Sequence, residues 1–499
     1  MIYNSTRGGG TPVSAAQAIV KGISADGGLY VPETIPRFTT AEVAGLVPLT
    51  YQQRAIAILR PFLTDYSEAE LSQCVGAAYN QLKFDTPAVA PVVRVDENRH
   101  VLELWHGPTS AFKDMALQLL PQLLSLALTK TQESAEIVIL VATSGDTGKA
   151  ALEGFKDVPR IKIVVFFPDN GVSEMQKLQM VTQEGNNVAV IRVRGNFDDA
   201  QTGVKQIFAD KSINAVLQRQ GFKLSSANSI NWGRLVPQIV YYFSAYADLI
   251  RARHIKVGQP VNFAVPTGNF GNILAGYYAS RMGLPINKLI CASNRNNVLT
   301  DFIRTGVYDR RREFYKTISP SMDILVSSNL ERLLYHVSGQ DTAAVAAWMG
   351  QLNERGYYQV DQMGLKQIQQ LFWADWVDDG QAMETIRSVY REYRYVLDPH
   401  TAVAWRATEN YRRQTGDLTP VVVLSTASPF KFNRSVLTAL HNEEPPRKDE
   451  FALLQDLAAM IKWPVPTQLV ALAAKPIRHQ LVCDKADMSA LLLDLLAKK

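Results

Sequence analysis

The sequence is poor in cysteine and contains no long apolar run. Its 499 residues include only Cys74, Cys291 and Cys483, which are too widely spaced for a disulfide framework or a zinc site. No uninterrupted apolar stretch approaches the ~18 residues of a transmembrane helix, and Met1–Arg7 lacks the basic-then-apolar pattern of a secretory signal. We therefore expect a cytoplasmic protein in a reducing compartment, with no metal and no membrane contact.

A large excess of one charge is missing as well. Lys and Arg number 52 against 47 Asp and Glu, which gives a net charge of +5. This weak positive charge suits small anionic substrates, but it does not indicate nucleic acid, and Arg310–Arg312 lacks interleaved aromatic residues. With 47% apolar residues and only 30 Gly and 24 Pro, the chain is neither disordered nor of low complexity.

Short apolar runs alternate with helical stretches through most of the chain. Residues 1–95 carry few strand signals, so we predict a mostly helical N-terminal domain there. Because continuous apolar strands between helices indicate parallel sheets covered on both faces, we predict an α/β fold for the rest. The expected strands lie at residues 101–105, 137–142, 161–167, 188–193, 261–265, 289–292 and 421–424.

This pattern also suggests where the units of the chain begin and end. A catalytic region is expected over residues 96–440, built from two α/β subdomains with parallel or mixed sheets, the smaller around residues 100–240. Residues 441–499 are expected to form a C-terminal helical segment, since residues 488–499 have the pattern of an amphipathic helix.

Three loops follow apolar runs, where open α/β sheets bind ligands. Thr267-Gly-Asn-Phe-Gly-Asn272 can fold around an anion at a helix start, or can be a plain strand-to-helix turn. Thr143-Ser-Gly-Asp-Thr-Gly148 offers hydroxyls and amides to a carboxylate or phosphate, or is simply a capped helix start. In His106–Asp114, Lys113 is either a desolvated nucleophile or a surface lysine paired with Asp114.

In this order, the three loops resemble those of the fold-type II pyridoxal-phosphate (PLP) enzymes, and further motifs resemble the threonine synthase family. The motifs extend from residue 3 to residue 431, and as an ordered set they are highly specific. They are Tyr3-Asn-Ser-Thr-Arg-Gly8, Asp26-Gly-Gly-Leu-Tyr-Val-Pro32, His106-Gly-Pro-Thr-Ser-Ala-Phe-Lys-Asp114, Ala142-Thr-Ser-Gly-Asp-Thr-Gly148, Asn228-Ser-Ile-Asn-Trp-Gly-Arg234, Pro266-Thr-Gly-Asn-Phe-Gly-Asn272, Asp398-Pro-His-Thr-Ala-Val-Ala404 and Ser425-Thr-Ala-Ser-Pro-Phe-Lys431.

The resemblance implies a lyase that converts O-phospho-L-homoserine and water to L-threonine and phosphate, the last step of threonine biosynthesis. Lys113 would hold PLP and, when freed, move protons at Cα and Cβ of the substrate. Asp146 would face the phenolic oxygen of the cofactor and share a proton with it. Thr426, or alternatively Ser425, would bond the pyridine nitrogen. The cofactor phosphate would lie on Gly268, Asn269, Phe270, Gly271 and Asn272.

The same motifs imply a second anion site for the substrate. Arg234 is its natural centre because guanidinium binds phosphate with two parallel hydrogen bonds, although it could instead form an ion pair on a helix surface. Lys149 stands where the family commonly has a small residue, and we expect it to face solvent. The implied contacts are Thr143, Ser144 and Thr147 for the carboxylate, and Ser229, Asn231 and Arg234 for the phosphate.

Two other functions stay open at this point. A phospho-lyase acting on a related phosphoamino acid would use the same loops, but it would release a ketoacid, ammonia and phosphate. A PLP-binding protein without catalytic activity is the third hypothesis, and the intact Lys113, Asp146 and Gly268–Asn272 argue against it. The sequence gives no indication of the oligomeric state.

Overall fold

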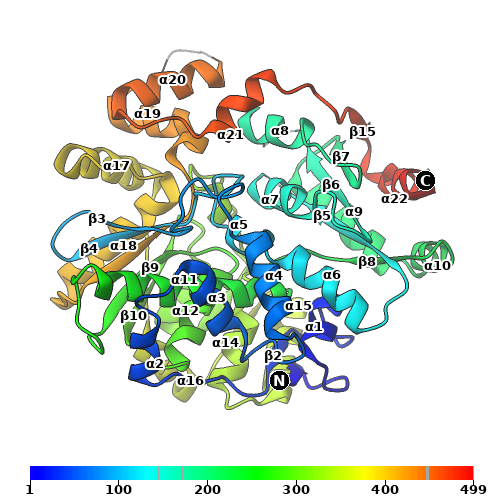
Figure 1. Cartoon of the computed structure of the whole chain (residues 1–499), viewed down its shortest axis with the longest axis horizontal. Helices are drawn as coiled ribbons and strands as arrows, with labels where there is room; N and C mark the ends of the chain where they lie inside the picture. The colour runs from blue at the N-terminus through cyan, green and yellow to red at the C-terminus, as the bar shows by residue number, and fades with distance from the viewer. Residues whose placement is uncertain (144, 170–171, 173, 446–448, 498–499) are drawn as a thin grey trace.

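The N-terminal segment is mostly helical, as predicted. The computed structural model describes residues 1–143, 145–169, 172, 174–445 and 449–497. Its first part is a two-stranded antiparallel sheet with four helices, each starting at a Ser or Thr that caps the helix by bonding the amide three residues on. In Figure 1, α3 and α4 lie near the middle of the view, and α1 and α2 lie toward its lower edge. The elements are β1 (Tyr3–Ser5), α1 (Ala15–Lys21), β2 (Tyr30–Pro32), α2 (Thr40–Gly45), α3 (Tyr51–Leu59) and α4 (Glu68–Ala78).

A six-stranded sheet forms the larger of two α/β units. Its strand order is β13-β10-β9-β14-β4-β3, with every pair parallel except β3 and β4. Val422 and Leu424 of β14 join the core that contains α11 and α12, whereas Val421 and Val423 join the core of α17 and α18. The elements are β3 (Val92–Arg94), β4 (Arg99–Glu103), β9 (Val261–Pro266), β10 (Ile286–Ser293), β13 (Phe372–Trp376), β14 (Val421–Ser425), α11 (Trp232–Arg251), α12 (Gly271–Arg281), α17 (Asp379–Tyr393) and α18 (Pro399–Thr415).

A five-stranded, all-parallel sheet forms the smaller unit. Its order is β15-β7-β6-β5-β8. Ile137 and Ile139 face the core shared with α6 and α7, while Val138 and Leu140 face the core shared with α9 and α22. The elements are β5 (Glu136–Ala142), β6 (Ile161–Pro168), β7 (Val188–Val193), β8 (Phe222–Ser225), β15 (Leu481–Cys483), α6 (Leu120–Lys130), α7 (Asp146–Phe155), α9 (Phe197–Ala209) and α22 (Met488–Ala497).

The predicted fold class is confirmed, but some details differ. The predicted strand near residue 101 belongs to the larger sheet as β4, because it pairs with β14 rather than with β5. The C-terminal segment, expected to be helical, also supplies β15 to the edge of the smaller sheet and crosses the molecule to reach it (Figure 1). After Lys113 the chain forms two successive helices, since α5 (Asp114–Leu117) ends before α6 begins.

The remaining elements connect and cover these two units. None of the helices within the described ranges is long and apolar enough to cross a membrane. The elements are α8 (Glu174–Val181), α10 (Lys211–Arg219), α13 (Val298–Thr305), β11 (Val307–Asp309), η1 (Pro320–Met322), α14 (Leu330–Val337), α15 (Thr342–Arg355), β12 (Tyr357–Gln359), α16 (Gln362–Leu371), η2 (Pro429–Phe432), α19 (Asn433–His441), α20 (Glu450–Ile461), α21 (Thr467–Val470), η3 (Ala471–Ala474) and η4 (Lys485–Asp487).

The predicted site residues all follow the carboxyl ends of parallel strands. In the larger sheet, neighbouring strands β4, β14 and β9 lead into the segments that hold Lys113, Thr426 and residues 267–272. In the smaller sheet, neighbouring strands β5 and β8 lead into the starts of α7 and α11. Because parallel strands place their carboxyl ends on one edge, both sheets direct these segments toward ligand-binding positions.

Candidate active site

The amine of Lys113 lies nearly buried among polar groups from distant parts of the chain. Its Nζ is 3.3 Å from Ser321 Oγ and 3.9 Å from Asp146 Oδ2. Burial lowers the pKa of Lys113 from 10.5 to about 8; Asp146 opposes this shift, while the cations Lys431 and Arg234 add to it. An amine with this pKa is partly unprotonated near neutral pH, so it can act as a nucleophile.

The alternative interpretation of Lys113, a surface lysine paired with Asp114, is wrong. The side chain of Lys113 is only 11% exposed. Asp114 is fully buried and accepts hydrogen bonds of 2.8 Å from both the amide and the hydroxyl of Thr109. Burial raises the pKa of Asp114 to about 6 despite these bonds. Asp114 therefore fixes the shape of the loop that carries the lysine, instead of neutralising the amine.

Asp146 is the first residue of α7 and belongs to a buried cluster of charges. Its Oδ1 lies 2.6 Å from Lys431 Nζ and accepts a 3.1 Å hydrogen bond from Gln176. Burial alone would raise the pKa of Asp146, but Lys431 and Lys113 outweigh it and hold the pKa well below its usual range. The carboxylate is therefore ionised, and the protein itself supplies its counter-charge.

The rest of the loop before α7 gives mixed support to the predicted carboxylate contacts. The hydroxyl of Thr143 accepts 3.0 Å hydrogen bonds from the amides of Gly145 and Gly148, so it shapes the turn from within. The contact predicted between Thr143 and a substrate carboxylate gains no support from this geometry. Thr147 is half-buried in the first turn of α7, and Ser144 lies outside the described residues.

The loop over residues 267–272 packs closely against the backbone around Ser321 and leads directly into α12. Phe270 has a left-handed backbone (φ 64°) immediately before α12 begins. A Cβ on Gly268 would lie 2.7 Å from the carbonyl oxygen of Ser321, so only glycine fits there. Asn272 is buried; its Oδ1 accepts hydrogen bonds from Tyr241 and Tyr242, but its Nδ2 has no partner among the described residues.

The start of α11 holds a second buried donor. Arg234 is 4% exposed and its Nε lacks a hydrogen-bond partner within the described part of the chain. Burial lowers the pKa of Arg234 to about 10. The alternative of an ion pair on a helix surface is therefore excluded. Asn231 is already engaged, because it caps α11 through the amide of Gly233 and donates to the carbonyl of Ile19. Ser229 is half-exposed in the turn before the helix.

The segment after β14 distinguishes the two hydroxyls proposed for the pyridine nitrogen. Ser425 accepts a 3.1 Å hydrogen bond from the indole of Trp105 and a 3.2 Å hydrogen bond from Thr401. No hydrogen bond of the Thr426 hydroxyl is found among the described residues. The geometry thus favours Thr426, because the hydroxyl of Ser425 is already engaged. Ser428 is fully buried, and its hydroxyl has no partner among the residues described.

Three residues of the cluster were not predicted as site residues. Lys431 lies inside a matched motif, but nothing in the sequence indicated that its amine would reach Asp146. Ser321 lies in η1, outside all of the motifs found in the sequence. Its amide donates to His400 Nε2, and His400 is in turn held by Asp398, so this histidine positions the loop beside Lys113. Gln176 lies outside the motifs found in the sequence, so nothing marked it as a site residue.

Lys149 differs from its expected solvent-facing position. Its amine is 9% exposed, lies 3.0 Å from Glu153 and also contacts Gln183. Burial lowers its pKa. Lys149 was expected in solvent, but α8 packs against α7 and covers the face that would otherwise be exposed. Lys149 is therefore a structural ion-pair residue, separate from the cluster around Lys113.

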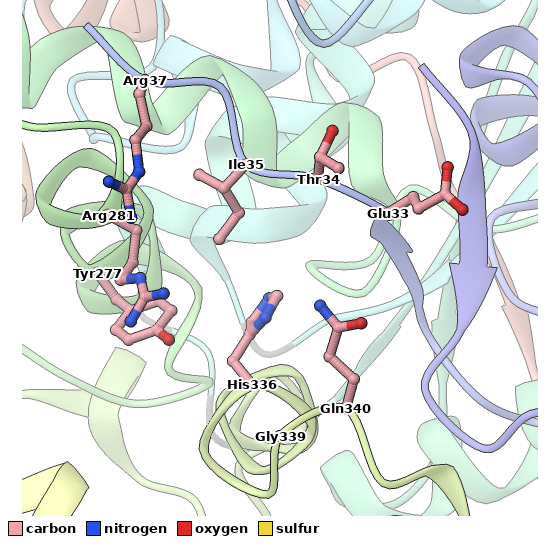
Figure 2. A pocket seen from close by; sticks show the side chains of 9 residues that line it. All are labelled: Glu33, Thr34, Ile35, Arg37, Tyr277, Arg281, His336, Gly339 and Gln340. Atoms are coloured by element: carbon pink, nitrogen blue, oxygen red, sulfur yellow. The ribbon is translucent and has the colours of Figure 1, made fainter. Parts of the chain in front are cut away.

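A pocket of about 410 Å³ lies away from the cluster around Lys113. Figure 2 shows the side chains that line it. It is bounded by the segment after β2 and by the C-terminal ends of α12 and α14, whose N-terminal ends lie near residues 267–272. Tyr277, which lines the pocket, lies about 9 Å along the axis of α12 from Gly271 in that loop. It includes none of the predicted site residues, and its lining residues are Glu33, Thr34, Ile35, Arg37, Tyr277, Arg281, His336, Gly339 and Gln340.

Comparison with known families covers three successive parts of the chain. Residues 2–79 match the family "Threonine synthase N terminus", residues 91–371 match "Pyridoxal-phosphate dependent enzyme", and residues 401–490 match "Threonine synthase, C-terminal". The middle match contains Lys113, Asp146 and the loop over residues 267–272. The three matches lie in the order of the motifs found in the sequence.

Individual relatives agree with these families. Threonine synthase of Pseudomonas aeruginosa is 43% identical over 446 residues, which cover 89% of this chain and 92% of that protein. Threonine synthase-like 1 of Macaca fascicularis is 44% identical over 439 residues, or 86% of this chain, but the chain spans only 58% of that longer relative, and likewise of its human counterpart. The PLP-bound threonine synthase of Brucella melitensis has a TM-score of 0.88 at 37% identity, with 99% of this chain and 98% of that chain covered.

The residues present fit a phosphorylated aldehyde cofactor. Lys113 supplies a buried amine of lowered pKa, and Asn272 supplies, at the start of α12, a buried donor for which the described residues offer no partner. Fold and site therefore define a pyridoxal-phosphate-dependent enzyme of fold type II. With the N-terminal and C-terminal matches and the relatives above, the identification goes further: the chain belongs to the threonine synthase family.

Proposed function

We propose that this chain converts O-phospho-L-homoserine and water to L-threonine and inorganic phosphate, as the last step of threonine biosynthesis. The observation that carries the proposal is the presence of two separate buried donors, each at the start of a helix that follows a parallel strand. Asn272 at the start of α12 and Arg234 at the start of α11 each have an N–H group without a partner among the described residues. Two anions, one on the cofactor and one on the substrate, would satisfy both groups.

In this proposal, residues 268–272 and Thr426 bind the cofactor while Lys113 holds it. When bound, pyridoxal phosphate supplies an electron sink that makes C–H bonds of the substrate acidic. Lys113 takes protons from Cα and Cβ and returns protons to the carbon skeleton, because its lowered pKa lets the amine exist in both forms. The C–O bond at Cγ breaks as phosphate departs, and the oxygen of water bonds to Cβ.

Arg234 holds the departing phosphate, and its buried guanidinium stabilises the charge that grows on the leaving oxygen. Thr147 and the amides at the start of α7 bind the substrate carboxylate at the positive end of that helix. The motif also predicts that Ser144 binds this carboxylate. Binding at both ends of the substrate orients Cγ and Cβ relative to the amine of Lys113.

Product analysis tests this proposal directly. The purified protein, reconstituted with PLP, is incubated with O-phospho-L-homoserine, and threonine, phosphate and ketoacid are measured separately. Equal amounts of threonine and phosphate, without ketoacid, are expected. Ketoacid and ammonia in place of threonine would identify a phospho-lyase instead. Absence of phosphate release from a protein that has bound PLP would indicate a binding protein without this activity.

We also propose that the enzyme works in the cytoplasm. Cys74, Cys291 and Cys483 are all buried and free. Burial raises the pKa of Cys74 and Cys291 to about 12 and that of Cys483 to about 11, so the thiols stay protonated. Three reduced thiols suit a reducing compartment. Fractionation of the source cells with an antibody to the chain tests this assignment.

A further inference from the structure

Lys431 is a fully buried cation whose contacts are all directed at the site. Its side chain has no exposed surface. Its amine lies 2.6 Å from Asp146 Oδ1 and donates a 2.9 Å hydrogen bond to the carbonyl of Thr109, in the loop before Lys113. A buried lysine is stable only when its charge is neutralised. Lys431 therefore links η2 to α7 through an ion pair and to the loop of Lys113 through a hydrogen bond.

The two oxygens of Asp146 have different surroundings. Oδ1 receives Lys431 and Gln176, while Oδ2 faces Lys113 at 3.9 Å. A carboxylate with Lys113 as its sole counter-charge would bind that amine in its protonated, unreactive form. Lys431 changes this balance, because it neutralises the carboxylate and also repels a proton from the Lys113 amine. The expectation that Asp146 must share a proton with the cofactor is then unnecessary.

We propose that Lys431 is a positioning residue that keeps Asp146 as a charge-balanced carboxylate and thereby leaves the Lys113 amine free to react. The inference rests on the proposed role of Lys113 as the cofactor-binding lysine, but not on the identity of the substrate. It also gives a reason why a buried acid, and not an amide, can stand at position 146. An amide would need no buried counter-cation, whereas a carboxylate does.

The electrostatics make a signed prediction for three variants. The charged groups that act on the Lys113 amine are Asp146 and Asp114, which favour its protonation, and Lys431 and Arg234, which oppose it. Lys431→Met leaves Asp146 to hold the proton, so the titration midpoint of Lys113 rises. Asp146→Asn leaves the cations in excess, so the midpoint falls. The double variant removes one charge of each sign and returns the midpoint toward that of the wild type.

The experiment measures the amine of Lys113 without any substrate. The full-length protein, freed of PLP, is labelled with acetic anhydride between pH 6 and pH 10, and acetylation of the Lys113 peptide is quantified by mass spectrometry. At pH 7 the labelling rate should fall ~10-fold or more in Lys431→Met, because each tenfold loss of free amine corresponds to one pKa unit. The rate should rise several-fold in Asp146→Asn and lie between the two in the double variant. The pH at which the absorbance of bound PLP changes should shift in the same order.

Two further variants keep the test decisive. Lys149→Met removes another buried lysine of the same region, paired with Glu153 rather than Asp146, and should leave the Lys113 midpoint unchanged. Lys431→Arg keeps the charge and should restore most of the wild-type midpoint. If Lys431→Met folds only when combined with Asp146→Asn, the unpaired carboxylate is the defect and the proposal stands. An unchanged midpoint in Lys431→Met, or a double variant that fails to fold while Asp146→Asn folds, would overturn it. Neither result depends on whether phosphohomoserine is the substrate.

Discussion

The starts of α7 and α11 both bury a charged side chain near Lys113, but they treat the charge in opposite ways. At α7, Asp146 lies 2.6 Å from a buried lysine and accepts a second hydrogen bond from Gln176. At α11, Arg234 donates from one terminal nitrogen to the carbonyl of Ala227, and its Nε has no partner among the described residues. Asp146 has a counter-charge within 2.6 Å, whereas no ion pair of Arg234 occurs in the described part of the chain.

The difference separates groups that set the chemistry from groups that await a ligand. An unbalanced buried charge costs stability, so a protein keeps one where an anion completes the site. A balanced buried charge needs no ligand, but it fixes the field around its neighbours. Arg234 therefore belongs to recognition, whereas Asp146 with Lys431 belongs to the control of the Lys113 amine.

The largest effect is expected when the Lys113 amine itself is removed, because both Asp146 and Arg234 act on it. Lys113→Ala should lower turnover by ~10²–10⁴-fold or more, because proton transfer and cofactor attachment are both lost. Weak PLP binding should persist through residues 268–272. Steady-state rates and borohydride fixation of the cofactor in the wild-type protein provide the measurements. Recovery of the fixed cofactor on any other lysine would show that the wrong residue has been assigned.

A smaller loss should follow when the unbalanced charge is removed. Arg234→Ala should lower kcat/KM by ~10- to 150-fold, since a hydrogen bond to a charged group contributes ~1.5–3 kcal/mol. PLP content and the cofactor spectrum should hardly change.

The matched control is Asn272→Asp, which keeps an acceptor for Tyr241 and Tyr242 but loses the free donor and adds a negative charge. It should weaken PLP binding by ~10-fold or more, with substrate KM little changed at saturating PLP. If Arg234→Ala loses PLP while substrate affinity survives, the two phosphate sites have been assigned in reverse.

The smallest effect concerns His106, which forms ion pairs with two carboxylates. Its Nδ1 lies 2.6 Å from Asp85 and its Nε2 lies 2.8 Å from Glu103. Burial alone would lower the pKa of His106, but the two carboxylates outweigh it and raise the pKa from 6.5 to about 9. The raised pKa means that the stabilisation is complete below pH ~6.5 and is lost as the pH rises through ~9.

Urea unfolding at several pH values and constant ionic strength measures this contribution. Wild type should lose up to ~3 kcal/mol between these limits relative to His106→Gln, and less to the extent that the half-exposed Asp85 is screened by solvent. Parallel stability curves for the two proteins would show that His106 is not charged in the folded state.

Features carried by local patterns could be predicted from the sequence. The helix α11 is of this kind, because its apolar content and the capping Asn231 act within a few residues of each other. The strands were found because their apolar runs are continuous, but their ends moved by a few residues with the pairing partner. The ordered motifs also placed Lys113 and Asp146 in one site, and the structure brings them together.

Features that depend on distant pairing could not be predicted. Lys431 reaches Asp146 because β14 lies beside β4 in the larger sheet, which carries η2 toward the loop of Lys113. No local signal distinguishes such a lysine from an exposed one. The same reason explains why Lys149 was wrongly placed in solvent, since the cover on its helix comes from α8. The hydroxyl of Thr143 and the amide of Asn231 fit ligand roles by composition, but backbone groups nearby use them first.

The strand order has a consequence for folding during translation. In the larger sheet, β14 lies between β9 and β4, so the middle of that sheet is completed only after residue 425 has been synthesised. The smaller sheet likewise receives its edge strand β15 from residues 481–483. Until then, β4 and β9 each expose an apolar edge that can pair with another nascent chain. The late strand β14, which brings Lys431 to the site, therefore also determines how long the edges of the larger sheet stay unpaired during translation.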